Sequence, residues 1–333
     1  MSPSNSNVRK LYAGMHDGVC ALFQSGEKNG WSQGPVTPLP HAASRFSWSR
    51  ANPRRAYLAA YESGVYRTDD GGNTWRNLLS YPTDYAHSVL ADPSDADSIY
   101  VGSEPADVLR SHDGGETWET CPAFRAVPES DQWSFHSETR YSHVRDLRAA
   151  PYDPDLLYAG IEVGGVIRSV DGGSTWEQCT GPDPDIHFVN PSASCPGRVY
   201  LATARGPYRS DDGGKTWEIL DKGLERTYTV HISSADDDPD LVLVTVSRNA
   251  GRSLPQFYRS EDGGKKWDLI EQVGSSDDMV VAIDWDPEEP SRVYAGTDSG
   301  KVFYSDDRGR NWAQVTLDLG TLAVGALVVA PVG

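Results

Sequence analysis

The stretch SDDGGKTW, from Ser210 to Trp217, decides the fold because it recurs along the chain. Five further copies follow the same pattern: TDDGGNTW at 68–75, SHDGGETW at 111–118, SVDGGSTW at 169–176, SEDGGKKW at 260–267 and SDDRGRNW at 305–312. A weaker copy, SGEKNGW, ends at Trp31. The closing tryptophans stand at 31, 75, 118, 176, 217, 267 and 312, so the chain is a repeat with a period of roughly 45 residues.

Each copy has the sequence of a hairpin turn. An Asp side chain that bonds its own backbone precedes two glycines, which accept the left-handed conformation that tight turns require. Short apolar segments precede each copy, for example 89–93 and 99–102, and bring the count to four short strands per period. Four strands in about 45 residues are typical of one propeller blade. We therefore predict an all-β, seven-bladed β-propeller.

The two ends of the chain are expected to close the ring together. The first segment supplies strands for a blade but lacks an innermost strand, and the run LAVGALVVAP at 322–331 has the pattern of that strand. Sharing one blade would leave no open sheet edge. The prediction is a single domain over residues 1–333. Its blades cover approximately 8–34 plus 321–332, 35–80, 81–122, 123–180, 181–222, 223–272 and 273–320.

Composition narrows the class of partner. Lys and Arg total 30 and Asp and Glu total 48, which gives a net charge of −18. Nucleic acid and anionic membranes both require a basic surface, so neither is expected as the main partner. The polar start, Met1 to Lys10, has no apolar core of a signal peptide, and the four cysteines include no CxxC pair. We therefore expect a cytoplasmic protein, with monomer and dimer both open.

The repeated pattern SxDxGxxW resembles the Asp-box, or BNR, repeat. That repeat occurs in sialidases, sortilin-type receptors, xyloglucan-active glycosidases and photosystem II assembly factors, and the resemblance covers nearly the full chain. It implies a β-propeller. It implies little about function, because the boxes of this family are structural and lie away from the active face.

Loop lengths and histidines indicate which face carries function. The long intervals owe their length to insertions at 123–142 and 247–256, and strand order places both on the face opposite the boxes. Long loops on a rigid scaffold are common functional sites. Seven of the eight histidines are also predicted on that face, and only His112, inside a box, is not.

Four of these histidines are the candidate metal ligands, since neutral imidazole is a common ligand. They lie at or just before the inner strands of four successive blades: His87, His143, His187 and His231, with His16 and His41 in reserve. Iron is the expected metal, with copper, manganese or zinc as alternatives. Local hydrogen bonding of each histidine is the competing interpretation. The positions are not in one register, because His87 stands six residues before Pro93 whereas His143 stands eight before Pro151.

Glutamates occupy equivalent loops of three adjacent blades: Glu62, Glu104 and Glu162. A carboxylate beside a ligating histidine fixes its tautomer, so these residues would orient the ligands or act as a general base. They are the candidate catalytic residues, and a solvated acidic rim is the alternative. The layout resembles that of carotenoid-cleaving oxygenases, whose propeller holds iron on four histidines backed by glutamates. Asp boxes are not a feature of that family.

Three residues are candidates for substrate binding. Arg145 and Arg205 would hold an anionic group, and Trp133 would stack on a flat substrate or sugar. Trp133 is equally suited to a small core inside its own insertion. The arginines do not reproduce the three-arginine clamp of sialidases.

Three functions remain open. The first is a metal-dependent enzyme of oxygenase, hydrolase or lyase type, acting on a small molecule at the mouth of the channel. The substrate would be an anion or a carbohydrate. The second is an Asp-box glycosidase or lyase that uses carboxylates without metal. The third is a non-enzymatic binding or assembly propeller.

Overall fold

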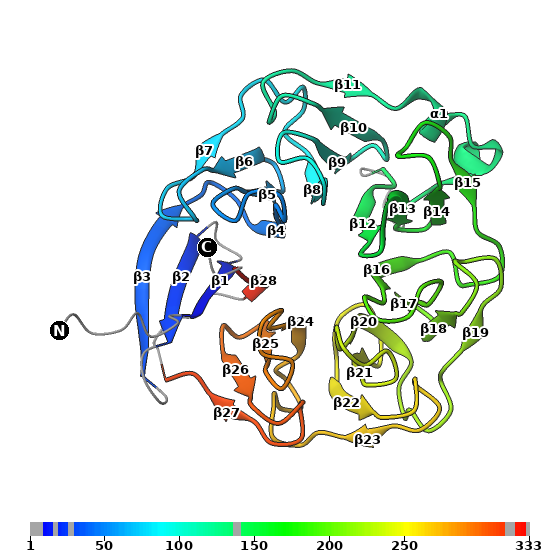
Figure 1. Cartoon of the computed structure of the whole chain (residues 1–333). Helices are drawn as coiled ribbons and strands as arrows, with labels where there is room; N and C mark the ends of the chain where they lie inside the picture. Colours follow the sequence, from blue (N-terminus) through cyan, green and yellow to red (C-terminus); the bar gives the residue numbers. More distant parts are fainter. Residues whose placement is uncertain (1–8, 16–18, 26–29, 136–140, 317–323, 331–333) are drawn as a thin grey trace.

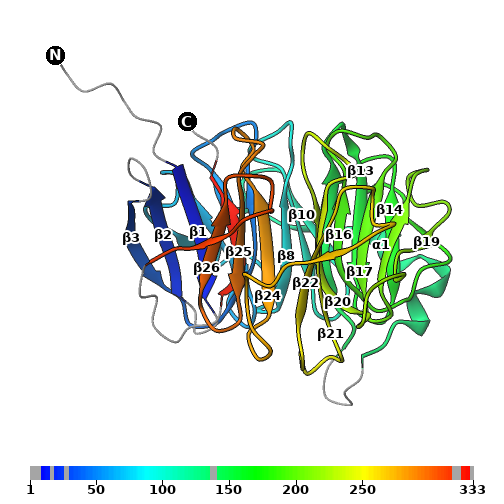
Figure 2. The same cartoon turned by 90° about the horizontal axis from the view of Figure 1, so that it is seen from below.

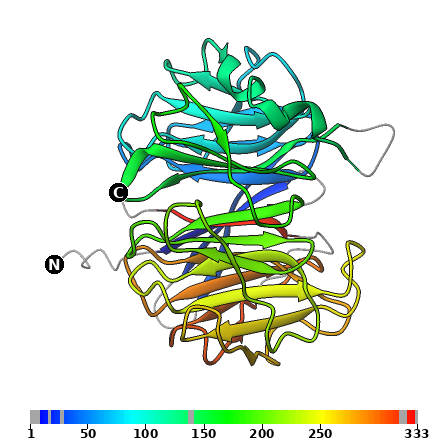
Figure 3. The same ribbon diagram turned by 90° about the vertical axis from the view of Figure 1, so that its right-hand side faces the viewer.

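The computed structural model describes residues 9–15, 19–25, 30–135, 141–316 and 324–330. Within these ranges the chain forms four-stranded antiparallel sheets, arranged as a ring around a central axis (Figure 1). Seen edge-on, the strands run from one face of the ring to the other (Figures 2 and 3). The all-β propeller predicted from the repeat is confirmed.

Six blades are each built by one continuous run of strands, with the first strand innermost. Their inner, second and third strands carry most of the hydrogen bonding, and each outer strand has two residues. The first three blades are β4–β7 (Ala43–Trp48, Ala56–Ala60, Gly64–Thr68, Arg76–Asn77), β8–β11 (Ala86–Ala91, Ile99–Ser103, Val108–Ser111, Glu119–Thr120) and β12–β15 (Val144–Ala150, Asp153–Ile161, Gly165–Ser169, Glu177–Gln178). The next three are β16–β19 (Ile186–Pro191, Val199–Thr203, Pro207–Ser210, Glu218–Ile219), β20–β23 (Tyr228–Ser234, Val242–Ser247, Gln256–Ser260, Asp268–Leu269) and β24–β27 (Val280–Trp285, Val293–Thr297, Val302–Ser305, Ala313–Gln314).

The remaining sheet is composite and closes the ring. Its order is β28-β1-β2-β3, from β28 (Val324–Val329), β1 (Arg9–Met15), β2 (Val19–Ser25) and β3 (Trp31–Pro38). The innermost strand β28 pairs antiparallel with β1, with Leu11 opposite Val329 and Gly14 opposite Ala326. Strands from the two ends of the sequence therefore share one sheet.

The prediction of a seven-bladed propeller is wrong, because only six blades in the described part of the chain are of the Asp-box type. Six blades carry the Asp-box hairpin, and the composite sheet differs from them. Its outer strand β3 has eight residues instead of two. The physical reason lies in the sequence SGEKNGW, which lacks the Asp-Gly-Gly order of the short hairpin. Residues 26–29 of that copy lie outside the described ranges.

Helix is scarce in the described residues. Helix α1 (Pro122–Arg125) begins one residue before the insertion predicted at 123–142, and the 3-10 helix η1 (Pro128–Gln132) lies inside it. No helix among the described residues has the length and apolar character to cross a membrane.

The Asp box forms the same hydrogen-bonded hairpin in each of these blades. In the box at 210–217, Asp212 accepts from the Ser210 hydroxyl at 2.8 Å and from the Thr216 amide at 2.9 Å and hydroxyl at 2.6 Å. The Trp217 indole donates back to the Gly214 carbonyl at 3.0 Å. The preceding blade then binds the turn, since Arg168 donates to the Gly213 carbonyl at 2.6 Å. Each box therefore joins two blades.

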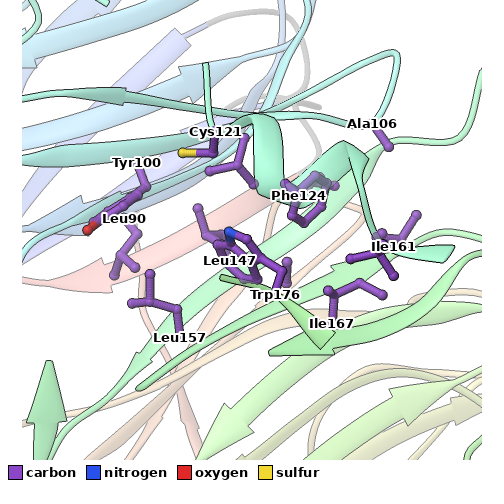
Figure 4. Close-up of a cluster of buried hydrophobic side chains, with 14 residues drawn as sticks. Leu90, Tyr100, Ala106, Cys121, Phe124, Leu147, Leu157, Ile161, Ile167 and Trp176 are labelled. Carbon is purple, nitrogen blue, oxygen red and sulfur yellow. The ribbon is translucent and has the colours of Figure 1, made fainter. Parts of the chain in front are cut away.

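Apolar side chains fill the space between neighbouring blades. Figure 4 shows this between the blades β8–β11 and β12–β15, where Leu90 and Tyr100 face Leu147 and Leu157. Phe124 of α1 packs edge-on against Trp176 of the box, with ring centroids 5.1 Å apart. This packing makes the ring a rigid support for its loops.

We name the two faces for use below. The box face holds the six Asp boxes and the turns from inner to second strand. The connection face holds the opposite loops, including 61–63, 104–107, 162–164 and 248–255.

Candidate functional site

The inner strands begin at the connection face, and each carries a β-bulge at the same position. The extra residue is Ser44 in β4, His87 in β8, Arg145 in β12, His187 in β16, Val230 in β20 and Val281 in β24. A bulge turns its extra side chain away from the regular alternation. The bulge therefore gives the true register of the histidines. His87 and His187 are equivalent, His143 stands two residues before the bulge, and His231 stands one residue after it.

His87, Glu104 and His143 converge between two adjacent blades. The Nε2 of His87 lies 2.9 Å from Oε2 of Glu104, and Nδ1 of His143 lies 3.6 Å from the same oxygen. The two imidazole rings are stacked with centroids 3.8 Å apart. The Tyr141 amide donates to Oε1 of Glu104 at 3.2 Å, which ties the segment before β12 to this cluster. Ligand atoms of these three residues all lie within 4.8 Å of one another.

The two nitrogens of His143 have different surroundings. Nε2 lies 3.1 Å from Oε2 of Glu162, which also accepts from the Arg145 guanidinium. Nδ1 is buried and has no hydrogen-bond partner among the described residues, because 3.6 Å to Glu104 is too long. Burial raises the pKa of Glu162, but Arg145 and His143 outweigh it and hold this pKa well below its usual range. Glu162 is therefore an anion that orients His143.

A second cluster lies one blade further on, around His187. Its Nδ1 lies 2.6 Å from the Thr229 carbonyl, and its Nε2 lies 3.1 Å from the Tyr228 hydroxyl and 3.4 Å from Asp185. Both ring nitrogens are thus engaged by protein groups. Burial raises the pKa of Tyr228 to about 12. His187 does not join His87 and His143, and local hydrogen bonds account for its position.

His231 lies deeper, inside the central channel. Its ring lies against Phe188, tilted by 34° with centroids 3.8 Å apart, and burial lowers its pKa well below the usual value. The one-residue offset from the bulge places it on the channel wall. The structure thus brings together two of the four predicted histidines. The other two lie elsewhere: His187 is held by the Thr229 carbonyl and the Tyr228 hydroxyl, and His231 borders the channel.

The other candidate residues lie apart from this cluster. His41 pairs with Glu62 at 3.3 Å on the rim, where both side chains are exposed. Arg205 is 80% exposed and pairs with Asp183. Trp133 packs on Phe124, with ring centroids 5.3 Å apart, as part of the core under the insertion. His16 lies outside the described residues.

Sequence reasoning did not find Tyr228 and Asp185. Tyr228 and Asp185 occupy the position two residues before the bulge, as His143 does, so alignment by the bulge would have found them. Arg252 lies 4.0 Å from Asp298 in a loop of the connection face. Burial lowers its pKa, and the charge of Arg145 lowers it further.

Backbone strain gathers on the connection face. Five described residues other than glycine have positive φ, and four of them lie in its loops: Glu62, Val163, Arg252 and Leu254, with φ from 51° to 60°. The fifth, Arg308, replaces a box glycine. Such conformations cost about 1–3 kcal/mol each and are frequent at functional sites.

The cluster of His87, Glu104 and His143 fits a divalent transition metal by three criteria. Two donors about 2.1 Å from one ion are roughly 3.0–3.4 Å apart, which is near the separations of the Glu104 oxygen from the two imidazoles. A ligating histidine usually gives its other N–H to a carboxylate, as His143 does to Glu162. The buried Nδ1 has no partner of its own. One of the stacked rings would turn to admit an ion.

Sequence comparisons identify the repeat. The model for "Sortilin, neurotensin receptor 3" (Sortilin-Vps10) matches residues 255–328, and the BNR/Asp-box repeat model matches 109–120 and 208–218. No curated protein sequence matches the chain.

Solved structures of two kinds are similar in fold. The Niastella koreensis GH74 enzyme is 15% identical with a TM-score of 0.66, over 92% of this chain and 55% of that one. The GH74 xyloglucanase from Xanthomonas campestris is also 15% identical, with a TM-score of 0.67, over 89% and 52%. YCF48 from Cyanidioschyzon merolae is 16% identical with a TM-score of 0.60, over 86% and 95%. The chain therefore spans about half of each GH74 enzyme but nearly all of YCF48.

Proposed function

The chain is a BNR/Asp-box repeat β-propeller. We propose that it is a metal-dependent enzyme whose active site lies in the loops of the connection face. His87, Glu104 and His143 would hold a divalent transition metal at the mouth of the channel. The proposal rests on one observation above all. His143 is buried with Nε2 beside Glu162, while its unpartnered Nδ1 lies on the side of Glu104 and His87.

The donor set favours iron. Two imidazoles and one carboxylate with open positions are the ligands of non-haem iron(II) oxygenases, and zinc accepts the same donors. When bound, such an ion acts as a Lewis acid or activates water or oxygen. Glu162 would hold the His143 tautomer in which Nδ1 is a free ligand, and the Tyr141 amide would help to position Glu104.

The neighbouring side chains support an anionic small molecule as substrate. Arg145 donates to Glu162 and keeps about a quarter of its side chain exposed. Arg252 is weakly paired, at 4.0 Å from Asp298, and the charges of Arg145 and Arg252 both act on Tyr228. Two guanidinium groups and a phenol hydroxyl are suited to orient a carboxylate or phosphate group.

Metal analysis tests the proposal directly. Protein purified without a nickel column and titrated with Fe(II), Zn(II), Mn(II) or Cu(II) should take up about one equivalent. His143→Ala and Glu104→Gln should weaken the affinity by about 10-fold or more. Glu62→Gln, the exposed glutamate of an equivalent loop, is the matched control and should bind as the parent does. Uptake of less than about a tenth of an equivalent in all four titrations would refute the metal site.

A protein-binding role is the second candidate. Nearly all of YCF48 aligns with this chain, and one YCF48 structure has a D1 peptide bound, at 17% identity and a TM-score of 0.59. A peptide partner is therefore plausible for a single propeller of this size. Retention of a captured partner by Glu104→Gln and His143→Ala, together with absent metal uptake, would favour this function.

The glycosidase alternative finds less support in the geometry. The GH74 structures favour it by fold, but the imidazole of His143 lies between Glu104 and Glu162. A glycosidase needs the space between its two carboxyl groups for the sugar and water. Activity on a glycan that survives a chelator and is lost in Glu104→Gln would nonetheless establish it.

A further inference from the structure

The central channel contains a second candidate site, separate from the metal cluster. A cavity of about 530 Å³ extends along it, lined by residues from the inner strands of all six blades and of the composite sheet. Judged by the inner-strand residues that line it, the cavity extends from the middle of the channel toward the box face. Cavities of about 300–1,000 Å³ commonly hold small ligands, on apolar walls with a few convergent polar groups. Both apolar residues and charged residues line this channel.

One side of the cavity is cationic. Arg45 and Arg148 share a single carboxylate, with each Nε 3.2 Å from an oxygen of Asp146. Asp146 also accepts from the Val189 amide at 2.9 Å. Both guanidinium groups stand over the Phe188 ring, at 5.4 and 4.6 Å from its centroid. Two cations on one anion leave a local excess of positive charge.

Arg148 has donors to spare. Its Nε binds Asp146, but Nη1 and Nη2 make no hydrogen bond within the described part of the chain, and the side chain is one-third exposed. Arg45, in contrast, also donates to the Ser44 and His187 carbonyls. Arg148 therefore presents the free edge of its guanidinium, the group that binds carboxylate and phosphate through paired hydrogen bonds.

Two buried polar atoms near the cavity lack partners among the described residues: Nδ1 of His231 and Nε1 of Trp285. Both residues border the cavity, and the Trp285 ring packs in the core between the blades β20–β23 and β24–β27. Unpaired buried polar atoms are uncommon and call for a specific explanation. Because both atoms are enclosed, the arginines and not these atoms provide the donors for a ligand in the cavity.

The opposite side of the channel is acidic, and its aspartates should make anion binding depend on pH. Asp284 accepts from the Val329 amide at 2.7 Å. Burial raises its pKa to about 7, with Asp236 and Asp286 raising it further and Arg148 lowering it. Arg45, Arg50 and His231 also face the cavity. Asp284 thus gains a proton and loses its charge as pH falls through neutrality, whereas an arginine side chain is not deprotonated in this range.

We propose that the channel binds a small organic anion, a carboxylate or a phosphate- or sulfate-type ester, with its charged group on Arg148 and Arg45 and its apolar part along Phe188. The free guanidinium edge, the excess of cations over Asp146 and the enclosed cavity carry this inference. It does not depend on the metal cluster.

Sulfate and succinate are suitable probes, measured by isothermal titration calorimetry on the full chain at low ionic strength. Saturable binding of either ion supports the proposal, and the preferred ion distinguishes a tetrahedral ester from a carboxylate. Arg148→Gln should weaken binding about 10-fold or more, since it removes the charge and the paired donors. Asp146 retains Arg45 and the Val189 amide in this variant, so the fold should persist.

Controls separate this site from other arginines and from the metal cluster. Arg76→Gln, in the outer strand β7, should bind sulfate as the parent does, and Glu104→Gln should as well. Arg148→Lys keeps the charge without the planar guanidinium and should give intermediate affinity. The proposal fails if the parent binds neither ion saturably, or if Arg148→Gln and Arg76→Gln bind alike.

A pH series gives an independent readout. Sulfate keeps its charge throughout, so its affinity should rise as pH falls from 8 to 6 and Asp284 is protonated. Asp284→Asn should bind more tightly than the parent at pH 8 and lose this dependence. An unchanged pH slope in Asp284→Asn would contradict the assignment of the channel charge.

Discussion

The two faces of this propeller use polar side chains in opposite ways. On the box face the same hydrogen bonds recur, and Asp113, Asp171 and Asp212 each accept from a Ser, a Thr hydroxyl and a Thr amide. On the connection face each blade differs, and polar groups are joined across blades, as the His187 ring is to the Thr229 carbonyl. Repetition with complete pairing stabilises the ring, whereas variation with unpaired atoms and strained loops provides a site.

The largest loss of stability is expected from a substitution at the second glycine of an Asp box. Gly264 has φ of +88°, and a Cβ there would lie 2.6 Å from Leu220 and 3.1 Å from Trp267. Gly264→Ala should lower the free energy of unfolding by about 2–5 kcal/mol, from backbone strain and overpacking. Gly71→Ala is the control, since φ is +71° but no atom lies within 4 Å of its Cβ. Urea unfolding that gives equal losses would refute the packing argument.

The next largest difference in stability is expected between breaking a buried ion pair and breaking an exposed one. Arg145→Gln removes the partner of a nearly buried glutamate, Glu162, and should cost about 2–3 kcal/mol. Arg76→Gln breaks the pair with Glu116 on the outer strand of a box blade, where both side chains are about half exposed. That loss should be about 0–1 kcal/mol. Chemical denaturation of both variants is the measurement, and comparable losses would be evidence against a special role for the buried pair.

Aspartates of the box face and the channel should give opposite pH dependences of stability. Hydrogen bonds from Thr117 lower the pKa of Asp113 to about 2, below its unfolded value of about 3.8. Its contribution is therefore present above pH 4 and is lost as pH falls through 2. Asp284 has its pKa raised by burial to about 7, so its contribution is present below pH 4 and is lost as pH rises through 7.

Unfolding free energies measured from pH 2 to 8 test both signs. Asp113→Asn should flatten the acidic part of the profile, and Asp284→Asn the part between pH 4 and 7. A parent profile that rises steadily up to pH 8, unchanged by Asp284→Asn, would contradict the assignment.

The smallest expected effect is a gain. Val163 is β-branched and has φ of 55°, in a loop of the connection face. Val163→Gly relieves this strain and should stabilise the protein by about 0.5–1 kcal/mol, after the entropy cost of glycine. Box glycines at similar φ offer no such gain, because the strain is already absent there. A thermal shift to lower temperature would indicate that Val163 makes a contact worth more than its strain.

The sequence predicts the scaffold better than the site, for a physical reason. The box motif fixes a local turn, so strands such as 99–103 and the closing strand at 324–329 follow from pattern alone. The site depends on bulges, which each add one residue and move the side chains that follow. This is why His231 lies in the channel, and why Arg145 occupies the position equivalent to His87. Trp133 shows the same limit, because spacing does not say whether an aromatic residue faces a ligand or the core.

The pairing of β28 with β1 also determines when the ring can close during synthesis. β1 is made before β28, and the edge of β1 that pairs with β28 has no partner until residues 324–329 have been synthesised. Translation at about 5–20 residues per second leaves that edge open for roughly 15–60 seconds, a period in which strand edges are prone to aggregate. β28 also lines the channel through Gly325 to Val329, so the nascent chain completes its cavity wall only at this last step. The channel can therefore bind a ligand only after all the strands of the ring have been synthesised and the ring has closed.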